Sequence, residues 1–263
     1  MDFRDLRSVD LPSLVDAFND AFSDYVLPMH ATVEGLADMF RRRGYDASLS
    51  VGAFDGDRIA GFVFNAIDGR EAYNTGTGVG REWRHRGVGR QLMQHAIEAV
   101  RGRADRYILE VIATNARAER LYRDVGFELT RTMTCWTYEP RREVILPRLD
   151  DWNTLESQRD VEPSWQNRSA SVRRTLGAVV LGDERGYVIV FPATGDVPQL
   201  VVHREHRRVG LGRDLLDAAA TVAGKTLRII NVDERDAGIA AFMEHIGAKL
   251  LIRQLEMIRA LGR

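Results

Sequence analysis

The sequence has a single cysteine, Cys135, among its 263 residues. One cysteine excludes an intrachain disulfide framework and a cysteine-based zinc site. No apolar run approaches the roughly 18 residues that a membrane-spanning helix needs. The first residues are acidic where a secretory signal would be basic. These absences predict a cytoplasmic protein that makes no use of a membrane.

Charge of neither sign is in excess, because 37 Lys and Arg face 38 Asp and Glu. We therefore expect neither nucleic acid nor anionic lipid as a partner. His203-x-x-His206 lacks a third ligand at a suitable spacing, so no metal site is expected. The chain has no Gly-x-Ser-x-Gly nucleophile elbow. Cys135 stands in a strand-like run and is expected to be a core residue.

The N-terminal half alternates between helical and strand-like patterns, which predicts a mixed α/β sheet flanked by helices. Gly76 and Gly78 stand inside one expected strand, where glycine often marks a bulge or the close approach of a ligand. The expected helices span residues 11–22, 32–43, 87–100 and 115–124, and the expected strands span 50–54, 59–66, 72–79, 107–112 and 128–138.

One long segment of the chain occurs twice. Residues 79–93 recur without a gap as residues 202–216, at an offset of 123 residues. Repetition over this length predicts two tandem copies of one domain. Prolines and a high charge density after residue 140 indicate a connection between the copies. The expected division is therefore a catalytic domain at 1–140, a connecting segment at 141–168 and a degenerate domain at 169–263.

The repeated segment contains Arg84-His85-Arg86-Gly87-Val88-Gly89, between a strand and a helix. Its glycines let a ligand approach the backbone, and the first amides of the helix have no intrahelical partner. Such a helix start binds phosphate groups, and Arg84, Arg86 and Arg90 add charge. The pattern lacks the third glycine of a Rossmann fingerprint and the Gly-Lys-Ser/Thr of a P-loop. The alternative reading is a glycine turn with solvated arginines.

A second motif runs from Asn115 to Glu128, after the expected strand at 107–112. The two motifs, in this order, spacing and strand–helix context, resemble those of the GNAT superfamily of N-acetyltransferases. The resemblance covers residues 1–140 well and the C-terminal half more loosely. It implies that the fourth and fifth strands splay apart and that acetyl-CoA lies in the gap between them.

The resemblance also implies roles for single residues. Val79 would bind the pantetheine arm and thioester through its backbone, Asn115 would bind the pantetheine, and Tyr122 would act near the sulfur. From the residues alone, Asn115 is also a plausible helix N-cap and Tyr122 a plausible core aromatic. The residues assigned to acetyl-CoA are Val79, Arg84, His85, Arg86, Gly87, Val88, Gly89, Arg90, Asn115 and Tyr122.

The expected reaction is direct attack of a primary amine on the thioester in a ternary complex. Tyr122, with an ordinary pKa of about 10, would protonate the leaving thiolate. Glu110, a carboxylate in an otherwise apolar strand, is the candidate base; the alternatives are a solvent-facing glutamate or a water relay at Tyr73 and Asn74. The acceptor, a small molecule or a peptide, would bind among the loop 23–29, Tyr25, Tyr73, Asn74 and Trp136.

The C-terminal copy keeps Arg207, Gly210 and the rest of the phosphate motif, but Asn115 is replaced by Asp236 and Tyr122 by Met243. A thioether has no proton to donate, so we expect no acetyl transfer in this half. Two alternatives stay open at this point. One is a non-catalytic acyl-CoA-binding sensor, and the other is a tandem acetyltransferase of the mycothiol synthase type, in which the C-terminal half is active.

Overall fold

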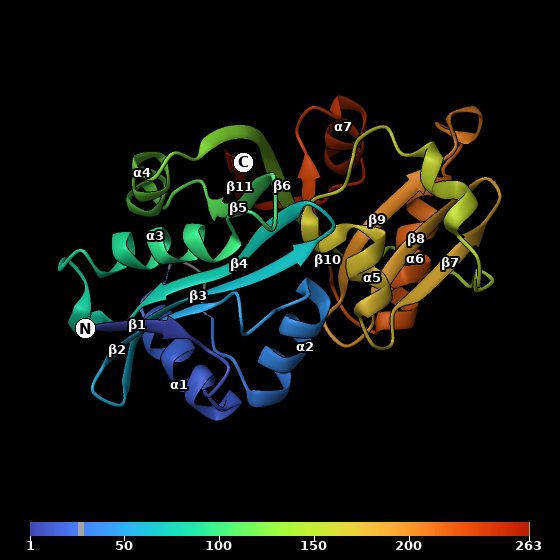
Figure 1. Cartoon of the computed structure of the whole chain (residues 1–263). Helices are drawn as coiled ribbons and strands as arrows, with labels where there is room; N and C mark the ends of the chain where they lie inside the picture. The colour runs from blue at the N-terminus through green and yellow to red at the C-terminus, as the bar shows by residue number, and fades with distance from the viewer. Residues whose placement is uncertain (26–28, 263) are drawn as a thin grey trace. The chain divides into compact units, whose positions relative to one another are not determined.

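A computed structural model of the chain describes residues 1–25 and 29–262 (Figure 1). The chain forms two compact units: an N-terminal unit of 1–130 with 256–263, and a C-terminal unit of 131–255. Two long strands, β6 (Glu128–Tyr138) and β11 (Lys249–Ala260), cross this division, so each contributes residues to both units. Among the described residues, no helix combines the length and the hydropathy that crossing a bilayer would require.

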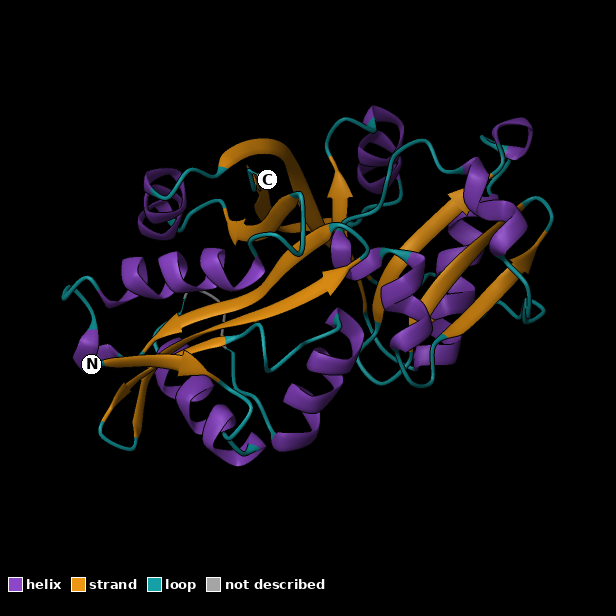
Figure 2. Cartoon of the chain, viewed as in Figure 1, coloured by secondary structure: helices purple, strands orange, loops and turns teal. Residues whose placement is uncertain are grey.

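The sheet of the N-terminal unit has the strand order β1-β2-β3-β4-β5, and the C-terminal end of β11 follows β5. Only the β4–β5 neighbours are parallel among the first five strands, so the sheet is mixed. Helices α1 and α2 cover one face and α3 the other (Figures 1 and 2). The elements are β1 (Asp2–Asp5), α1 (Leu11–Phe22), α2 (Val33–Arg43), β2 (Val51–Asp55), β3 (Arg58–Asp68), β4 (Glu71–Val79), α3 (Val88–Val100), β5 (Arg106–Ile112) and α4 (Ala116–Asp124).

Side-chain caps explain where α1 and α2 begin and end. The Asp10 carboxylate accepts the amide of Ser13 at 2.7 Å, and the Thr32 hydroxyl accepts the amide of Gly35 at 3.1 Å. Gly44 ends α2 with φ of 77°, a left-handed conformation that favours glycine. The expected helices at 11–22 and 32–43 are confirmed, and both pack their apolar faces on the sheet.

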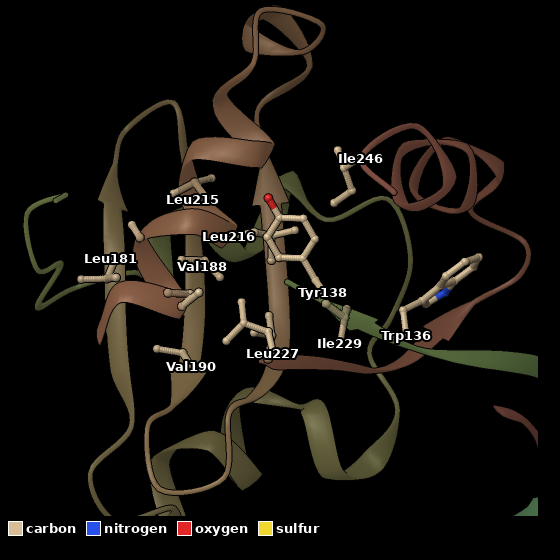
Figure 3. Close-up of a cluster of buried hydrophobic side chains, with 14 of the residues drawn as sticks. Trp136, Tyr138, Leu181, Val188, Val190, Leu215, Leu216, Leu227, Ile229 and Ile246 are labelled. Carbon is tan, nitrogen blue, oxygen red and sulfur yellow. The ribbon is translucent and has the colours of Figure 1, made fainter. Parts of the chain in front are cut away.

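The C-terminal unit repeats this plan with the strand order β6-β10-β9-β8-β7, in which β9 and β10 are parallel. Helix α6 packs on β8 and β9, and its leucines meet Tyr138 and Ile229 in the buried core shown in Figure 3. The elements are α5 (Ser169–Arg174), β7 (Val179–Asp183), β8 (Gly186–Phe191), β9 (Asp196–Val202), α6 (Leu211–Ala223), β10 (Leu227–Asp233) and α7 (Ala237–His245).

The segment 141–168 is part of the C-terminal unit, which corrects the expectation that it is a connection. Trp152 and Leu155 are buried in a second apolar cluster against Tyr187 and neighbouring strand residues. The backbone of the segment also pairs with the edge strand β7, because the Leu149 amide donates to the Val180 carbonyl at 3.0 Å. Its apolar side chains and edge pairing therefore complete this unit. The expected boundaries at 140 and 168 both lie inside one compact unit.

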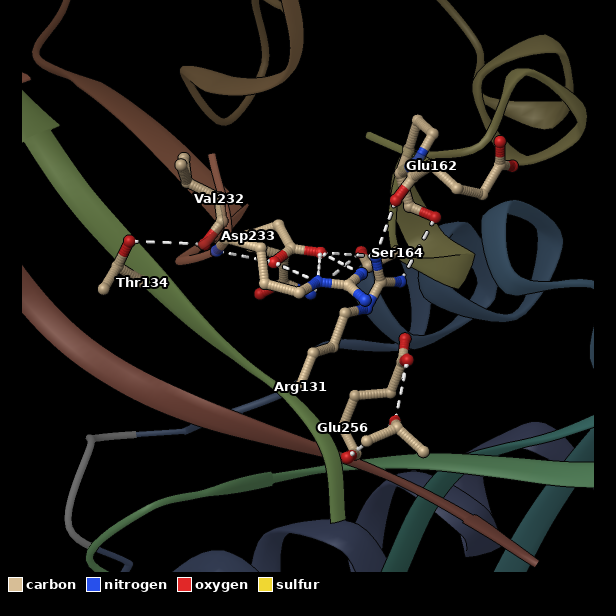
Figure 4. Close-up of polar contacts among 11 residues, drawn as sticks. Arg131, Thr134, Glu162, Ser164, Val232, Asp233 and Glu256 are labelled. Carbon is tan, nitrogen blue, oxygen red and sulfur yellow. Dashed lines mark hydrogen bonds and ion pairs between the residues drawn. The ribbon is translucent and has the colours of Figure 1, made fainter. Parts of the chain in front are cut away.

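A buried charge cluster fixes the end of β10 to the segment before α5 (Figure 4). Arg131 donates to the Asp233 carboxylate at 3.0 Å and to the Glu162 carbonyl at 2.6 Å. Arg235 donates to the same carboxylate at 2.6 Å. Burial alone would raise the pKa of Asp233, but the hydrogen bonds from Arg235 and Arg131 outweigh burial and hold the pKa below its ordinary value.

Replacing Asp233 by asparagine is expected to destabilise the protein by roughly 3 kcal/mol at pH 7, because the buried Arg131 then loses its ion pair with this carboxylate. A depressed folded-state pKa stabilises above the unfolded value, so this contribution is lost as the pH falls below about 4. Urea unfolding of both proteins at pH 7 and pH 3.5 measures the effect. A difference in stability that does not shrink at pH 3.5 would contradict the assignment.

Candidate active site

The parallel strands β4 and β5 separate halfway along the N-terminal sheet. Their pairing runs from Glu71 with Arg106 to Asn74 with Leu109, and in the described strands it does not continue beyond that pair. The separation begins at a bulge, because Phe64 and Asn65 of β3 face Gly76 and Asn74, so that Thr75 is the extra residue. A bulge bends its strand and increases the local twist. The expected bulge and the expected splay of these two strands are both present.

A tyrosine from α4 reaches one side of this gap. The buried Tyr122 hydroxyl is hydrogen-bonded to Thr77 on β4, and Thr77 accepts the Asn74 amide at 2.7 Å. Both β4 side chains also lie on the Met93 sulfur of α3. Burial raises the pKa of Tyr122 to about 12, the hydrogen bond with Thr77 lowers it, and the nearby Tyr25 adds to the rise. The tyrosine is therefore protonated at neutral pH.

A carboxylate occupies the other side of the gap. Glu110, half-buried, directly follows the last paired residue of β5. Tyr73 of β4 is buried, and its pKa is raised first by burial and then by the charge of Glu110, to which it is hydrogen-bonded. Arg43 lies close enough to act on Tyr73 and donates to the Thr75 carbonyl at 2.6 Å.

Tyr122 and Glu110 therefore lie on opposite faces of one sheet. Successive residues of a strand point to opposite faces. Asn74 points to α3, as its contact with Met93 shows, whereas Tyr73 points to the α2 side, where Arg43 lies. Tyr122 lies on the same face as Asn74, because both are hydrogen-bonded to Thr77, and Glu110 lies on the same face as Tyr73, to which it is hydrogen-bonded.

The phosphate motif forms a tight turn between β4 and α3. His85 has φ of 63° and Gly87 has φ of 78°, two left-handed residues that turn the chain into the helix beginning at Val88. The first amides of that helix face outward from its end. Arg86 is exposed, and Arg90 contacts the Asp124 carbonyl at 3.3 Å. His85 meets Arg117 of α4 at 3.3 Å.

The side chain of Arg84 does not point to this turn. Its guanidinium donates to the Val79 carbonyl at 3.1 Å, to the Ala21 carbonyl at 2.8 Å and to both oxygens of Asp24. These contacts do not support the expectation that this guanidinium binds a diphosphate, because its donors are directed at protein acceptors. Sequence reasoning missed Asp24 because it lies 60 residues away along the chain.

Most of the N-terminal unit matches a known protein family. Residues 11–127 match the model of the acetyltransferase (GNAT) family. The N-terminal unit of this chain belongs to the GNAT acetyltransferase family. A search of curated proteins found no match.

Solved structures extend the fold to the whole chain. A GCN5-related N-acetyltransferase from Sphaerobacter thermophilus is 15% identical with a TM-score of 0.75, covering 100% of this chain and 96% of that one. A tandem GNAT protein from the clavulanic acid biosynthesis pathway is 17% identical with a TM-score of 0.72, covering 100% and 99%. A putative acetyltransferase from Pyrococcus horikoshii is 17% identical with a TM-score of 0.73, covering 98% and 89%. The chain has the tandem GNAT fold.

The GNAT family implies acetyl-CoA as donor and an amine as acceptor. The residues present fit this donor, because a helix start suited to phosphate lies at one end of a gap between strands. Asn115 caps α4 by accepting the Ala118 amide at 3.1 Å, which confirms the N-cap expectation.

The GNAT repeat in the C-terminal unit keeps the gap. In the described strands, β9 pairs with β10 at two positions, the last being Val197 with Ile229. A cavity of about 510 Å³ is lined by residues of both strands and of the phosphate turn. Arg208 and Gly210 repeat the two left-handed residues, with φ of 66° and 95°. Met243, the counterpart of Tyr122, is fully buried in the apolar core.

The acceptor pocket expected from the sequence is only partly assembled. Trp136 belongs to the buried core of the C-terminal unit (Figure 3), which corrects its assignment to the pocket of the N-terminal half. Tyr25 packs edge-on against Phe22 at 5.1 Å between ring centres. Residues 26–28 of the expected loop lie outside the described residues. Cys135 is buried, as expected.

Proposed function

We propose that the N-terminal unit transfers an acetyl group from acetyl-CoA to a primary amine by direct attack in a ternary complex. One observation carries the proposal: Tyr122 and Glu110 reach the gap between β4 and β5 from opposite faces of the sheet. Such an arrangement suits a reaction that removes a proton from one partner and delivers a proton to the other.

Each residue has its own role in this mechanism. Glu110, alone or through water held by Tyr73, takes a proton from the attacking ammonium. The amine nitrogen then adds to the thioester carbonyl, which forms the C–N bond and an oxyanion, and the oxyanion collapses as the C–S bond breaks. Backbone amides near Val79 stabilise the oxyanion. Tyr122 gives its proton to the sulfur of the leaving thiolate and regains a proton from the nitrogen of the new amide. The Thr77 contact orients the Tyr122 hydroxyl, and the start of α3 at Val88 receives the diphosphate.

A direct assay tests this function. Release of free thiol from acetyl-CoA is measured with benzylamine, putrescine and a short peptide with a free N-terminus as acceptors, and the acetylated product is confirmed by mass spectrometry. Release that depends on an amine supports the proposal. Binding of acetyl-CoA without amine-dependent release from any of the probes would favour a non-catalytic acyl-CoA-binding protein.

The cavity of the C-terminal unit favours a second candidate function, binding of a CoA-type ligand without transfer. Its volume of about 510 Å³ lies within the range of small-molecule sites. Apolar strand residues and the phosphate turn line opposite parts of it. The Arg213 Nε, at the start of α6, is buried and has no hydrogen-bond partner among the described residues. Without a tyrosine at Met243, this cleft has no counterpart of the proposed acid.

Charge reversal at the two matched helix starts separates the sites. Titration calorimetry with CoA is expected to show two sites per chain. Arg90→Glu should weaken one and Arg213→Glu the other, each by about tenfold or more, because a charge-assisted contact to phosphate is lost. A single site in the parent protein, weakened only by Arg90→Glu, would rule out the second candidate.

A further inference from the structure

The first arginine of the phosphate motif joins two segments of the N-terminal unit. The Arg84 Nε donates to Val79 at the end of β4, and the two terminal nitrogens donate to Ala21 and Asp24 at the end of α1. The contact with Asp24 is bidentate, at 2.8 and 2.9 Å. We call these four residues the Arg84 clamp. A bidentate guanidinium–carboxylate pair fixes orientation as well as distance.

The Arg84 side chain is held by more contacts than the side chains of an isolated surface ion pair. The Arg84 side chain is 22% exposed, and two of its four hydrogen bonds go to backbone carbonyls. Arg81 approaches the same carboxylate at 4.0 Å. The hydrogen bond from Arg84 lowers the pKa of Asp24, so the carboxylate stays ionised at neutral pH. Isolated surface pairs contribute little, but here one fork ties a strand end to a helix end.

The second copy of the motif repeats two of these contacts, with a different carboxylate. Arg207, the counterpart of Arg84, donates through Nε to the Val202 carbonyl at 2.9 Å and through Nη2 to Asp160 at 2.6 Å. Arg204, the counterpart of Arg81, also binds Asp160, at 2.8 Å. The arginines share the 123-residue offset of the repeat, whereas Asp24 and Asp160 do not. Two segments outside the repeat therefore supply the carboxylates that bind the equivalent arginines.

The clamp in the N-terminal unit holds the residue that approaches the reacting groups. Tyr25 directly follows Asp24, its amide donates to the Phe22 carbonyl at 3.1 Å, and its ring packs edge-on against Phe22. Tyr25 lies near enough to Tyr122 to act on it electrostatically. The end of α1 therefore lies beside the hydroxyl that reaches the gap, and the clamp fixes that end to β4.

We propose that Arg84 is a positioning residue: through Asp24 it fixes the end of α1 and Tyr25 beside the gap, where the acceptor amine binds. The acceptor part of this inference rests on the proposed function. The clamp acts on acceptor binding and not on acetyl-CoA, because its donors are bonded to Val79, Ala21 and Asp24. Arg84, the first arginine of the motif, thereby links the end of β4 to the end of α1, beside which the acceptor binds.

The test uses Asp24→Asn and Arg84→Lys in the full-length protein, with Asp38→Asn as the matched control. Asp38 pairs with Arg41 on α2 and is likewise exposed, so the control removes one carboxylate charge from the same unit. Three quantities are measured: hydrogen exchange at the Ser23 and Tyr25 amides, acetyl-CoA affinity by calorimetry, and KM and kcat for the best of the three amine probes.

Both clamp variants are expected to speed exchange at the end of α1 and to raise the amine KM by about tenfold, with acetyl-CoA affinity within about twofold. The control should change none of these. Weaker acetyl-CoA binding with an unchanged amine KM would mean that Arg84 acts in acetyl-CoA binding, and would overturn the proposal. Unchanged hydrogen exchange at the Ser23 and Tyr25 amides would mean that the clamp does not order the end of α1, and would also overturn the proposal.

The two proposals fail in distinguishable ways. If no probe is acetylated by the parent protein, the proposed function fails, and the exchange and calorimetry arms still decide whether the clamp orders the end of α1 independently of acetyl-CoA. If transfer occurs and exchange rises but the amine KM does not, the clamp orders α1 without positioning the acceptor, and the proposal is overturned.

Discussion

Replacing Tyr122 by phenylalanine is expected to lower kcat by about 100- to 10,000-fold, the range that general acid catalysis contributes. The ring stays packed against Phe127, and only the hydroxyl that Thr77 orients is lost. Acetyl-CoA affinity should therefore stay within about twofold of the parent value. Steady-state kinetics with the best amine probe, together with calorimetry, measure both quantities.

Tyr45→Phe is the matched control for this substitution. Tyr45 belongs to the same unit, stacks on Phe40 and meets Phe64 edge-on, and burial raises its pKa to about 12 as well. It therefore tests the loss of a tyrosine hydroxyl away from the gap. Equal losses of kcat in both variants would assign Tyr122 to packing and remove the acid from the mechanism. A large loss in Tyr122→Phe alone supports its role.

Local signals in the sequence predicted most of the N-terminal sheet. Asp10, Thr32 and Gly44 cap or end their helices through contacts of a few residues, which a reader of the sequence can anticipate. The bulge next to Gly76 followed from a strand interrupted by glycine. The short β1, at residues 2–5, was missed because four residues carry too little periodicity.

Long-range partners were not predictable in the same way. Proline and charge after residue 140 indicated a connection between domains. Trp152 and Leu155 instead fill an apolar core there. These two large apolar side chains were the signal of a core, but the charged residues around them dominate the composition of the segment. Nothing in β6 or β11 says locally which unit each end of the strand joins. A sequence likewise shows the charge of Arg84 without showing that Asp24 neutralises it.

For the site residues, too, local signals were readable from the sequence and long-range contacts were not. The resemblance to the GNAT superfamily selected Tyr122 as a candidate, and its position as a carboxylate in an otherwise apolar strand selected Glu110. The sequence could not show that Thr77 holds the tyrosine or that Tyr73 is hydrogen-bonded to the glutamate, because both contacts depend on the register of β4 after its bulge. Strand register depends on pairing across the sheet, and a shift of one residue reverses the face of every side chain.

Replacing Glu110 by glutamine is expected to lower kcat/KM by about 100-fold or more near pH 7, because the attacking amine is then an ammonium without a base to accept its proton. The loss should shrink as the pH approaches about 10, where solvent deprotonates an alkyl amine unaided. Glutamine keeps the size of the side chain and its capacity to accept a hydrogen bond from Tyr73. The pH profile of kcat/KM for parent and variant is the measurement.

Replacing Tyr73 by phenylalanine distinguishes direct proton transfer to Glu110 from a water relay. If Glu110 accepts the proton directly, removing the Tyr73 hydroxyl should cost at most about tenfold, because the carboxylate remains and only one hydrogen bond is lost. If water bound at Tyr73 carries the proton, both variants should lose activity to a similar extent with the same pH dependence. A loss in Glu110→Gln that is constant from pH 7 to pH 10 would contradict both routes. It would mean that the carboxylate only holds β4 and β5 in place where their pairing ends.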